Sequence, residues 1–519
     1  MRDFARESAP VSASAVSPDA TVAELQQAMA AGEITSAELT RQYLRRISEL
    51  NPALHAVISV SQDAVAQAEA SDAARAASSG PRGPLEGIPV LVKDNVQVAG
   101  MPTTAGSPAL LGAQPPDAFI IARLRAAGAV ILAKANLSEW ANFRSIHSTS
   151  GWSTLGGQAA NPYSLDRNPS GSSSGSAVGV AAALAPLAVG TETDGSIISP
   201  ASACGIVGIK PTAGLVSRTG IVPLSPVQDT AGPMAATVAD AAALLSVLAA
   251  ADPLDPAVDP PEGPYPAQRD RGATEYSAFL DPGALEDARI GVWRSGSGAA
   301  SAATRAVLDA AVTQLRKLGA ALVDPVELPD VDKIGEPEWT ALKCEFKYGI
   351  NAYLRYLAAY GGAGDGVPGS LEELISFNAR NAGLVLSRFG QEIFEQSQAT
   401  SGELSDPGYL SARAAATRLA VTALETPVRE HQLDAIVSLT GTPAWLTDYV
   451  LGDHQVFGGS RPAAVSGWPS LTVPAGYVSG LPVGITFTGP RWSESRLIAL
   501  AYAFEQASAA RRAPRLLRT

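Results

Sequence analysis

The sequence predicts an α/β protein built around a largely buried sheet, and two observations lead to that class. The 519 residues are 46% hydrophobic and 17% charged, a composition typical of compact globular proteins and not of disordered ones. Along the chain, short apolar runs of strand length alternate with longer segments of helical spacing. This alternation is typical of helices that pack on a sheet, so most of the chain is expected to fold.

The N-terminal part predicts a flexible start, two capped helices and a buried strand. Residues 1–18 lack apolar periodicity and are expected to be flexible. Thr21 and Thr35 are each followed three residues later by a glutamate, which is the capping box that begins a helix. The second of these helices is expected to end near Asn51-Pro52. The apolar run that starts at Gly87 predicts a buried strand ending on Lys93.

The remaining segments continue the alternation of strands and helices. The stretch 168–176, NPSGSSSGS, has the composition of a flexible linker, although apolar segments follow it at once. The glycine-dense stretch 187–233 predicts tight turns in a packed core. A surface excursion is expected at 252–285, and mainly Ala-rich helices at 301–425. Further strands are expected at 129–133, 435–439, 471–474 and 483–487, and further helices at 118–127 and 496–506.

Charge and hydropathy exclude two classes of partner. The net charge of −12 argues against nucleic acid, because binding to phosphates needs clustered Lys and Arg. No apolar run reaches the ~18 residues of a membrane span, and the richest, 177–190, contains Pro186. We therefore expect a soluble protein without a membrane partner, either cytoplasmic or secreted after removal of a signal. The sequence carries no signal of its oligomeric state.

Cysteines and acidic residues give no sign of a metal site. Cys204 and Cys344 belong to no CxxC or Cys/His array, so two buried free thiols are expected. Glu192 and Asp194 lie in a Gly-flanked turn, where shaping hydrogen bonds is the expected role of their carboxylates. We expect no metal and no other cofactor.

One candidate nucleophile lies in a G-x-S-x-G pattern formed by residues 171–175, with Ser173 at its centre. In α/β-hydrolases this pattern forms an elbow that follows a core strand, whereas residues 161–169 are polar and contain two prolines. A Ser-His-Asp triad of this kind also needs a downstream histidine, and only His431 and His454 follow. The pattern therefore favours such a triad only weakly.

Lys93 offers a different kind of base. A lysine is protonated in water near pH 7, but desolvation lowers its pKa and makes the neutral amine available as a base. The apolar run before Lys93 would supply that burial. A single lysine at a strand end is more often a solvated cap, so Lys93 by itself does not establish a site.

Three segments in close order strengthen the case for a lysine-based site: LVKDN, GSSSGSA and GTETDGSIISPASACGIVGIKP. Together they resemble the amidase signature family, whose motifs are a GGSSGGSA-like segment, a GTDxGGSxRxPA-like segment and CGxxGxKPT. In this chain the motifs occupy residues 171–177, 190–201 and 204–212; the resemblance spans about 85–240 and is weaker from 435 to 506. It implies a large mixed twisted sheet covered by helices. That sheet would form a single compact domain over 19–510, with a helical and loop-rich portion around 252–425.

The resemblance also assigns catalytic roles by position. Ser196 takes the place of the nucleophile, Ser172 of the bridging serine and Lys93 of the general base, which together would form an acyl-enzyme that water then hydrolyses. It implies a cis peptide between Gly171 and Ser172, with Ser173 as a hydrogen-bonding support. The oxyanion would be bound by backbone N–H groups of one turn, formed by Thr193, Asp194, Gly195 and Ser196.

Two departures from the family pattern narrow the expected substrate. The family usually has glycine where this chain has Asp194 and commonly arginine where it has Ile198. Segments such as NLSEWANFRS, NPYSLDR and SLTGTPAW are similar to those of bacterial peptide amidases, which remove ammonia from the C-terminal amide of peptides. We therefore expect a small-molecule or peptide amide as substrate, with water, and take Asn142 and Trp445 as pocket candidates by position. A broad aryl or aliphatic amidase with the same triad, and an amidotransferase A-type subunit that needs partner chains, remain alternatives.

Overall fold

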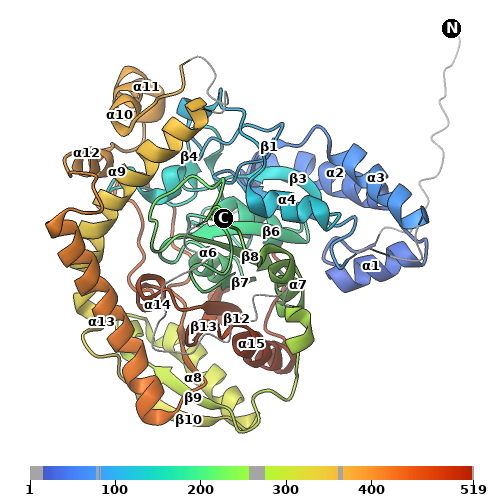
Figure 1. Cartoon of the computed structure of the whole chain (residues 1–519). Coiled ribbons are helices and arrows are strands. Elements are labelled where there is room, and N and C mark those ends of the chain that lie inside the picture. The colour runs from blue at the N-terminus through green and yellow to red at the C-terminus, as the bar shows by residue number, and fades with distance from the viewer. Residues whose placement is uncertain (1–15, 78–80, 82, 256–274, 360–365, 517–519) are drawn as a thin grey trace, which may run out of the picture.

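One large sheet organises the molecule. The computed structural model describes residues 16–77, 81, 83–255, 275–359 and 366–516. Most of the predicted flexible start and of the predicted surface excursion, residues 1–15 and 256–274, lie outside these ranges. Within them, eleven strands form a sheet in the order β1-β3-β2-β6-β8-β7-β12-β13-β11-β9-β10 (Figure 1). The strands are β1 (Val57–Val60), β2 (Pro89–Lys93), β3 (Val130–Ala135), β6 (Leu187–Glu192), β7 (Val207–Lys210), β8 (Thr230–Ala235), β9 (Arg289–Trp293), β10 (Ala321–Val326), β11 (Ala435–Leu439), β12 (Ser470–Val478) and β13 (Leu481–Thr488).

The sheet is mixed, as the family resemblance implied. β2 pairs parallel with both β3 and β6, and β9 pairs parallel with both β10 and β11. The centre of the sheet, from β6 through β8, β7, β12 and β13 to β11, is antiparallel throughout. A separate antiparallel ribbon joins β4 (Trp152–Ser153) and β5 (Gly157–Gln158).

Helices cover the sheet, and the helices predicted at 118–127 and 496–506 are present with bounds that differ from the predicted ones by at most two residues. α5 packs on β2, β6 and β8, while α6 lies against β7, β12 and β13. α9 and α13 pack side by side along one edge of the molecule, and α1, α2 and α3 gather at the opposite end (Figure 1). The helices are α1 (Val22–Ala30), α2 (Ser36–Leu54), α3 (Ala64–Ala77), α4 (Phe119–Ala126), α5 (Ser174–Ala181), α6 (Ile198–Ala203), α7 (Val238–Leu248), α8 (Ala302–Lys317), α9 (Gly335–Ala359), α10 (Leu371–Arg380), α11 (Ala382–Val385), α12 (Glu392–Gln398), α13 (Pro407–His431), α14 (Arg461–Ser466) and α15 (Glu494–Ser508).

Local signals at the N-terminus were accurate. Thr21 and Thr35 both form complete capping boxes, at the starts of α1 and α2. α2 continues past the predicted end through Pro52 to Leu54, and His55, with φ of 48°, closes it in the left-handed region. A helix continues as long as its carbonyl oxygens accept hydrogen bonds from N–H groups further along the chain. The His55 N–H still donates to the carbonyl oxygen of Asn51, so the last turn of α2 extends past Pro52.

The region 301–425 contains a strand that the prediction of mainly Ala-rich helices missed. β10 lies at the end of the sheet beside β9, and most of its residues are exposed or half-buried. An edge strand needs no continuous apolar run, and Pro325 is compatible with an edge because its missing N–H costs no sheet hydrogen bond there. The sequence pattern of such a strand is therefore weak.

The linker-like composition of residues 168–176 was misleading. Asn168 and the serines from Ser172 to Ser176 are buried, and α5 begins within the segment. Glycine is needed here for close packing: a Cβ on Gly175 would lie 2.3 Å from the carbonyl oxygen of Ala56. Small residues in this segment therefore serve tight packing and not flexibility.

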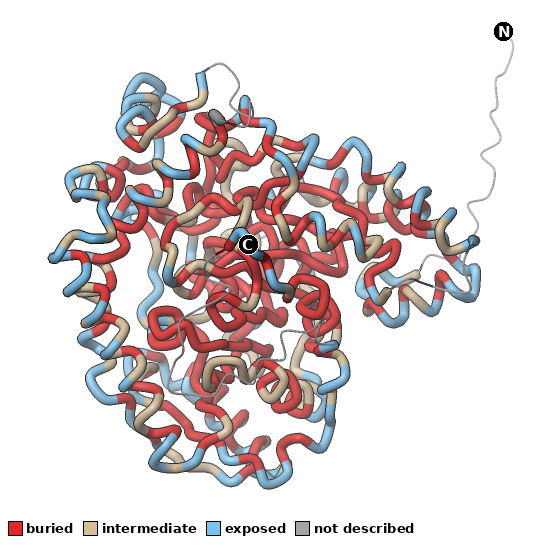
Figure 2. The backbone as a smooth tube through the Cα atoms, in the orientation of Figure 1, coloured by how far each residue is buried: buried red, intermediate tan, exposed pale blue. Residues whose placement is uncertain are grey.

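The interior is continuous across the sheet. Figure 2 shows buried backbone through the sheet and the inner faces of its helices, with exposed residues on the outer faces of the peripheral helices. Cys204 and Cys344 are buried free thiols, as predicted. Of the helices that the structure describes, none is both long and apolar enough to traverse a lipid bilayer.

Candidate active site

Lys93 lies at the buried end of an interior strand. β2 is flanked by β3 and β6, all five of its residues are buried, and the Lys93 side chain has no solvent exposure. Its Nζ lies 2.8 Å from Ser172 Oγ and 3.0 Å from Ser173 Oγ. The other two contacts are to Thr191, 2.8 Å to Oγ1 and 3.1 Å to the carbonyl oxygen. All four neighbours of the amine are uncharged oxygens.

This environment favours the neutral amine. Burial lowers the pKa of Lys93 from its ordinary 10.5 to about 7, because the charged form loses its water and its hydrogen-bond partners carry no charge. The carboxylates of Glu192 and Asp229 act in the opposite direction and raise this pKa. About half of the molecules therefore hold a neutral amine near pH 7, and only that form can accept a proton.

Ser172 and Ser173 reach the amine from the start of α5. The Gly171–Ser172 peptide is cis, the conformation that the family resemblance implies. The Ser173 N–H donates to the carbonyl oxygen of Ser196 at 3.1 Å, and its hydroxyl donates to that of Thr191 at 2.9 Å. Gly171 leaves room for a neighbouring serine, since a Cβ there would lie 2.2 Å from Ser138 Oγ. These contacts fix both hydroxyls beside Lys93.

Ser196 lies in the turn between β6 and α6. Its neighbours Ile197 and Ile198 donate their N–H groups to Glu192 Oε2, at 2.7 and 3.1 Å, which anchors the start of α6. The Ser196 hydroxyl itself makes no hydrogen bond to any residue that the structure describes. With 9% of its surface exposed, Ser196 is accessible from a cavity in front of it.

The backbone N–H groups of this turn differ in what they face. Gly195 has φ of +81°, a left-handed conformation that favours glycine, and its N–H faces the Glu192 carboxylate. The N–H groups of Asp194 and Ser196 donate to no acceptor within the described part of the chain. Free backbone donors in a tight turn are suited to binding an anionic oxygen.

A cavity of about 360 Å³ opens in front of these serines. Its inner side is formed by Gly171, Ser172, Asp194 and Ser196, whereas Lys93 and Ser173 lie behind that wall. The other lining residues come from two distant loops and the ends of α6 and α14: Ala141, Asn142, Ser150, Ser199, Asp453, Gln455, Val456, Phe457, Gly458, Ser460 and Arg461. Ser172 and Ser196 thus share one cavity, while the lysine amine contacts Ser172 from the protein side.

Asp194 is held by residues that the sequence did not indicate. Its Oδ1 accepts a hydrogen bond from Ser460 Oγ at 2.5 Å, and Arg461 Nε lies 3.6 Å from its Oδ2. Arg461 also contacts Glu338 Oε2 at 2.9 Å. The family pattern has an arginine at the position of Ile198; here the arginine near the nucleophile turn comes from α14 instead.

Asp453 is the second carboxylate of the cavity. Its oxygens accept the Ser150 N–H at 2.9 Å and the Ser150 hydroxyl at 2.5 Å, while Asn142 Nδ2 donates to Ser150 Oγ at 3.1 Å. Burial raises the pKa of Asp453 above its ordinary value. Asn142, a pocket candidate by position, therefore does line the cavity. Asp453 and Ser150 were missed because neither belongs to a motif; their role arises from two loops that meet.

Trp445 differs from Asn142 in its placement. It is buried, its carbonyl oxygen accepts the Asn168 N–H at 2.7 Å, and it is absent from the described residues that line the cavity. Its side chain instead contacts the carboxylate of Asp453, which does line the cavity.

The alternative serine and metal sites are not formed by the described residues. The Ser173 hydroxyl contacts Lys93 and Thr191, and of the two downstream histidines His454 pairs with Asp448 at 3.0 Å. No group of three or more His, Cys, Asp or Glu side chains in the described ranges is arranged to hold a metal ion.

Comparisons with known proteins give a consistent result. The family model for Amidase matches residues 38–498. The native peptide amidase from Stenotrophomonas maltophilia is 47% identical, with a TM-score of 0.88 over 96% of this chain and 98% of that chain. A probable amidase from Arabidopsis thaliana is 40% identical over 513 residues, which are 96% of this chain and 92% of that protein. The A-type component of the glutamyl-tRNA(Gln) amidotransferase from Symbiobacterium thermophilum is 35% identical over 503 residues, 94% of this chain and 96% of that protein.

The large mixed sheet with its helical cover, together with these matches, defines a single-domain hydrolase that acts on amide C–N bonds. The chain belongs to the amidase signature family.

Proposed function

We propose that this enzyme hydrolyses the C-terminal amides of peptides or amino-acid amides, using Ser196 as nucleophile, Ser172 as proton relay and Lys93 as general base. One observation carries the proposal. The fully buried Lys93 amine, with a pKa of about 7, lies 2.8 Å from Ser172 Oγ, and Ser172 shares a cavity with Ser196. The pocket and the base thus meet at a single serine.

The hydrogen bonds around Lys93 favour Ser172 over Ser173 as the relay. The Ser173 proton is given to the carbonyl oxygen of Thr191, and the Ser173 oxygen also accepts the Thr191 N–H. Ser173 can therefore accept from the amine but has no proton left to give it. Ser172 contacts the amine and also lines the cavity, so its proton can pass to the nitrogen lone pair.

The reaction then has two stages. As Ser196 Oγ attacks the carboxamide carbon, its proton moves to Ser172 and the Ser172 proton moves to Lys93. The relay returns the proton to the leaving nitrogen, the C–N bond breaks, ammonia leaves and an ester to Ser196 remains. Water gives a proton to the same relay as it attacks that ester; the C–O bond to Ser196 then breaks to give the free acid, and the relay returns the proton to Ser196 Oγ.

The turn that carries Ser196 supports stabilisation of the oxyanion. The N–H groups of Asp194 and Ser196 are without acceptors in the described part of the chain, so binding an oxyanion would not break existing hydrogen bonds. The Gly195 N–H, in contrast, faces the Glu192 carboxylate. Within the predicted set of Thr193, Asp194, Gly195 and Ser196, we therefore favour the Asp194 and Ser196 N–H groups over that of Gly195 as donors to the oxyanion.

Two features favour a peptide or amino-acid amide as the substrate. The cavity of about 360 Å³ is at the small end of ligand pockets and is lined by many hydrogen-bonding side chains, among them Asn142, Ser150 and Asp453. These groups suit the polar backbone of a terminal residue better than an aryl or long alkyl group. The 47% identity to a peptide amidase over nearly the whole chain points in the same direction.

Ammonia release from a substrate panel tests the proposal. The panel contains C-terminally amidated peptides, the same peptides with free carboxylates, amino-acid amides and aryl anilides. We expect turnover of the amidated compounds, loss of turnover in Ser196→Ala, and retention of turnover in Ser176→Ala, a matched buried serine whose hydroxyl bonds to the carbonyl oxygen of Val189. No turnover of any amide would contradict the proposal.

The same panel separates the alternatives. Turnover of anilides alone would assign a broad aryl amidase with the same triad. Turnover that appears only after addition of a partner chain would identify the protein as an A-type amidotransferase component. The 35% identity to such a protein is the reason for testing this alternative.

A further inference from the structure

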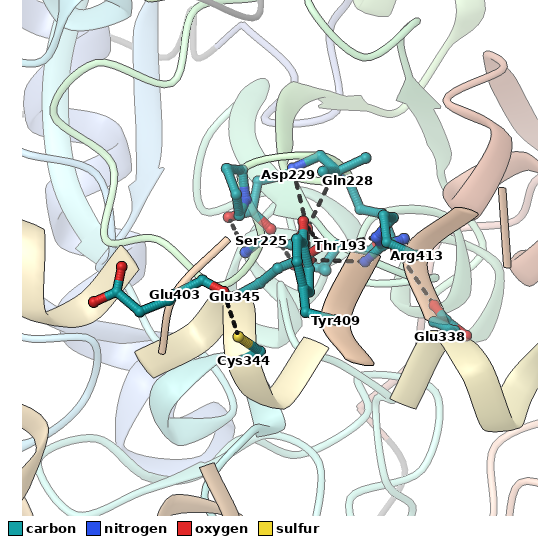
Figure 3. A network of polar contacts seen from close by, with 12 residues as sticks. Thr193, Ser225, Gln228, Asp229, Glu338, Cys344, Glu345, Glu403, Tyr409 and Arg413 are labelled. Carbon is teal, nitrogen blue, oxygen red and sulfur yellow. Dashed lines mark hydrogen bonds and ion pairs between the residues drawn. The ribbon is translucent and has the colours of Figure 1, made fainter. Parts of the chain in front are cut away.

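A buried polar network lies directly behind the turn that carries Ser196. Its members come from α9, from α13 and from the loop that precedes β8, and Figure 3 shows Gln228 and Asp229 of that loop beside Thr193, to which both are hydrogen-bonded. Gln228 is at its centre and is 1% exposed. Gln228 is hydrogen-bonded to Ser225, Thr193, Glu338 and Arg413, and to none of Lys93, Ser172 and Ser196.

The orientation of the Gln228 amide is fixed by its neighbours. Its Oε1 faces Arg413 Nη1 at 2.7 Å, and arginine can only donate. Its Nε2 faces the carbonyl oxygen of Thr193 at 3.2 Å, which can only accept, and Glu338 Oε1 at 2.9 Å. Rotating the amide by half a turn would break the hydrogen bonds to Arg413 and Thr193. Gln228 therefore holds the Thr193 carbonyl with a defined N–H group.

That hold also sets the direction of the Asp194 N–H. The Thr193–Asp194 peptide is trans, and in a planar trans peptide the C=O and N–H groups point in opposite directions. With the Thr193 carbonyl fixed towards Gln228, the Asp194 N–H must point away from the network. Asp194 lines the cavity on its other side, and its N–H has no acceptor in the described residues.

The network is anchored by an ion pair between two long helices. Arg413, on α13, contacts Glu345, on α9, with two hydrogen bonds of 2.7 Å each. Tyr409 and Ser225 donate to the same carboxylate at 2.9 and 2.6 Å. Arg413 is thus held by a carboxylate that is itself fixed by two further donors, as a precise support requires.

A second connection reaches the same turn through Glu338. This carboxylate accepts Gln228 Nε2 on one oxygen and Arg461 Nε on the other, and Arg461 approaches Asp194. The backbone of Thr193 and the side chain of Asp194 are therefore connected to one carboxylate on α9. Thr193 Oγ1 is also fixed, by Asp229 Oδ1 at 2.6 Å.

We propose that Gln228, oriented by Arg413, is a positioning residue that directs the Asp194 N–H towards the oxyanion of the amide hydrolysis described above. This inference rests on the proposed function. Gln228 touches neither substrate nor nucleophile; it acts through the Thr193–Asp194 peptide. Loss of Gln228 should therefore weaken the enzyme's stabilisation of the transition state and leave its affinity for the substrate nearly unchanged.

The test compares two variants of Gln228 with a control variant on α9, the helix that carries Glu345. Gln228→Met keeps the length of the side chain and removes its hydrogen bonds, whereas Gln228→Glu keeps an acceptor for Arg413 and removes both N–H donors. Cys344→Ala is the control: Cys344 is buried on α9 beside Glu345, and its Sγ lies 3.6 Å from the carbonyl oxygen of Glu403, away from the turn (Figure 3).

The readouts are kcat and KM for an amidated dipeptide, and the affinities of the matching peptide aldehyde and of the product acid. The aldehyde forms a tetrahedral adduct with Ser196 and so needs the oxyanion donors, whereas the product acid does not. Because removing one such donor outright costs ~10²–10³-fold in kcat, we expect a fall of about 10- to 100-fold in both Gln228 variants. The aldehyde should weaken by a similar factor, while KM and product binding stay within about threefold. Cys344→Ala should keep kcat within about twofold.

The outcomes distinguish this inference from the proposed function. If the unsubstituted enzyme hydrolyses no amide, both fail. If it is active and both Gln228 variants keep kcat and aldehyde affinity within about twofold, only the positioning role is overturned. A loss of folding in both variants, or equal weakening of aldehyde and product, would assign Gln228 a purely structural role and would also overturn it.

Discussion

The pKa of Lys93 leads to a quantitative prediction for the pH dependence of the enzyme. If Lys93 is the general base, kcat/KM for an amide substrate rises as pH increases through about 7, because protonation removes the lone pair that accepts the proton. The change of kcat/KM with pH has the direction expected for a general base: kcat/KM falls in acid and reaches a plateau above the pKa. An ordinary lysine would give the same rise only near its usual 10.5.

The size of the effect follows from burial. Lowering the pKa from 10.5 to about 7 raises the neutral fraction at pH 7 from ~0.03% to about half. This change corresponds to roughly 5 kcal/mol against the charged amine, at ~1.4 kcal/mol for each tenfold change. At pH 5 only about 1% of the amine is neutral, so kcat/KM should lie about 100-fold below its plateau.

The assay is the initial rate of ammonia release from an amidated dipeptide at low concentration, between pH 5 and 9.5. Glu338 is the main competing explanation, because burial and the nearby Asp194 raise its pKa to about 7 as well. In Glu338→Gln the rate should fall while the midpoint stays near 7, and Lys93→Met should be inactive throughout. A flat profile between pH 5 and 8, or loss of the midpoint in Glu338→Gln, would refute the assignment of Lys93.

Three further predictions concern single side chains. Ser196→Ala should lower turnover by ~10⁴-fold or more while the Tm stays within about 2 °C; substantial remaining turnover would point to another nucleophile. Gly175→Ala places a Cβ within 2.5 Å of backbone atoms of neighbouring segments and should lower the free energy of unfolding by at least ~1–3 kcal/mol. The control Gly383→Ala, with open space around it, should be neutral or slightly stabilising. Equal urea midpoints for the two variants would contradict this prediction. Arg413→Met leaves the Glu345 carboxylate buried without its cation and should lower the free energy of unfolding by about 3–5 kcal/mol, and an unchanged urea midpoint would argue against that loss.

Elements with local causes were predictable from the sequence. The capping boxes at Thr21 and Thr35 depend on residues three positions apart, so the chain carries the whole signal. The same holds for the apolar run that ends on Lys93. Edge strand β10 was missed because its stability comes from a neighbouring strand, and its own residues need not be apolar.

The candidate triad was an intermediate case. Lys93, Ser172 and Ser196 each have an ordinary explanation as single residues, and only the order and spacing of three motifs indicated a common site. The GSSSGS segment shows the limit of composition, since it resembles a linker and yet packs in the core. Composition describes the residues of a segment, whereas burial depends on what the rest of the chain places around it.

By itself the sequence predicted the α/β class, the capped helices and the candidate triad of Lys93, Ser172 and Ser196. The tertiary structure decided the chemical state of those residues and what supports them. Lys93 has a pKa of about 7 because β3, β6 and α5 exclude water from its amine. Gln228 meets Arg413 across 185 positions of sequence, and Ser150 meets Asp453 across 303. Such contacts leave no local pattern, because they form only when distant segments are brought together by the folding of the sheet.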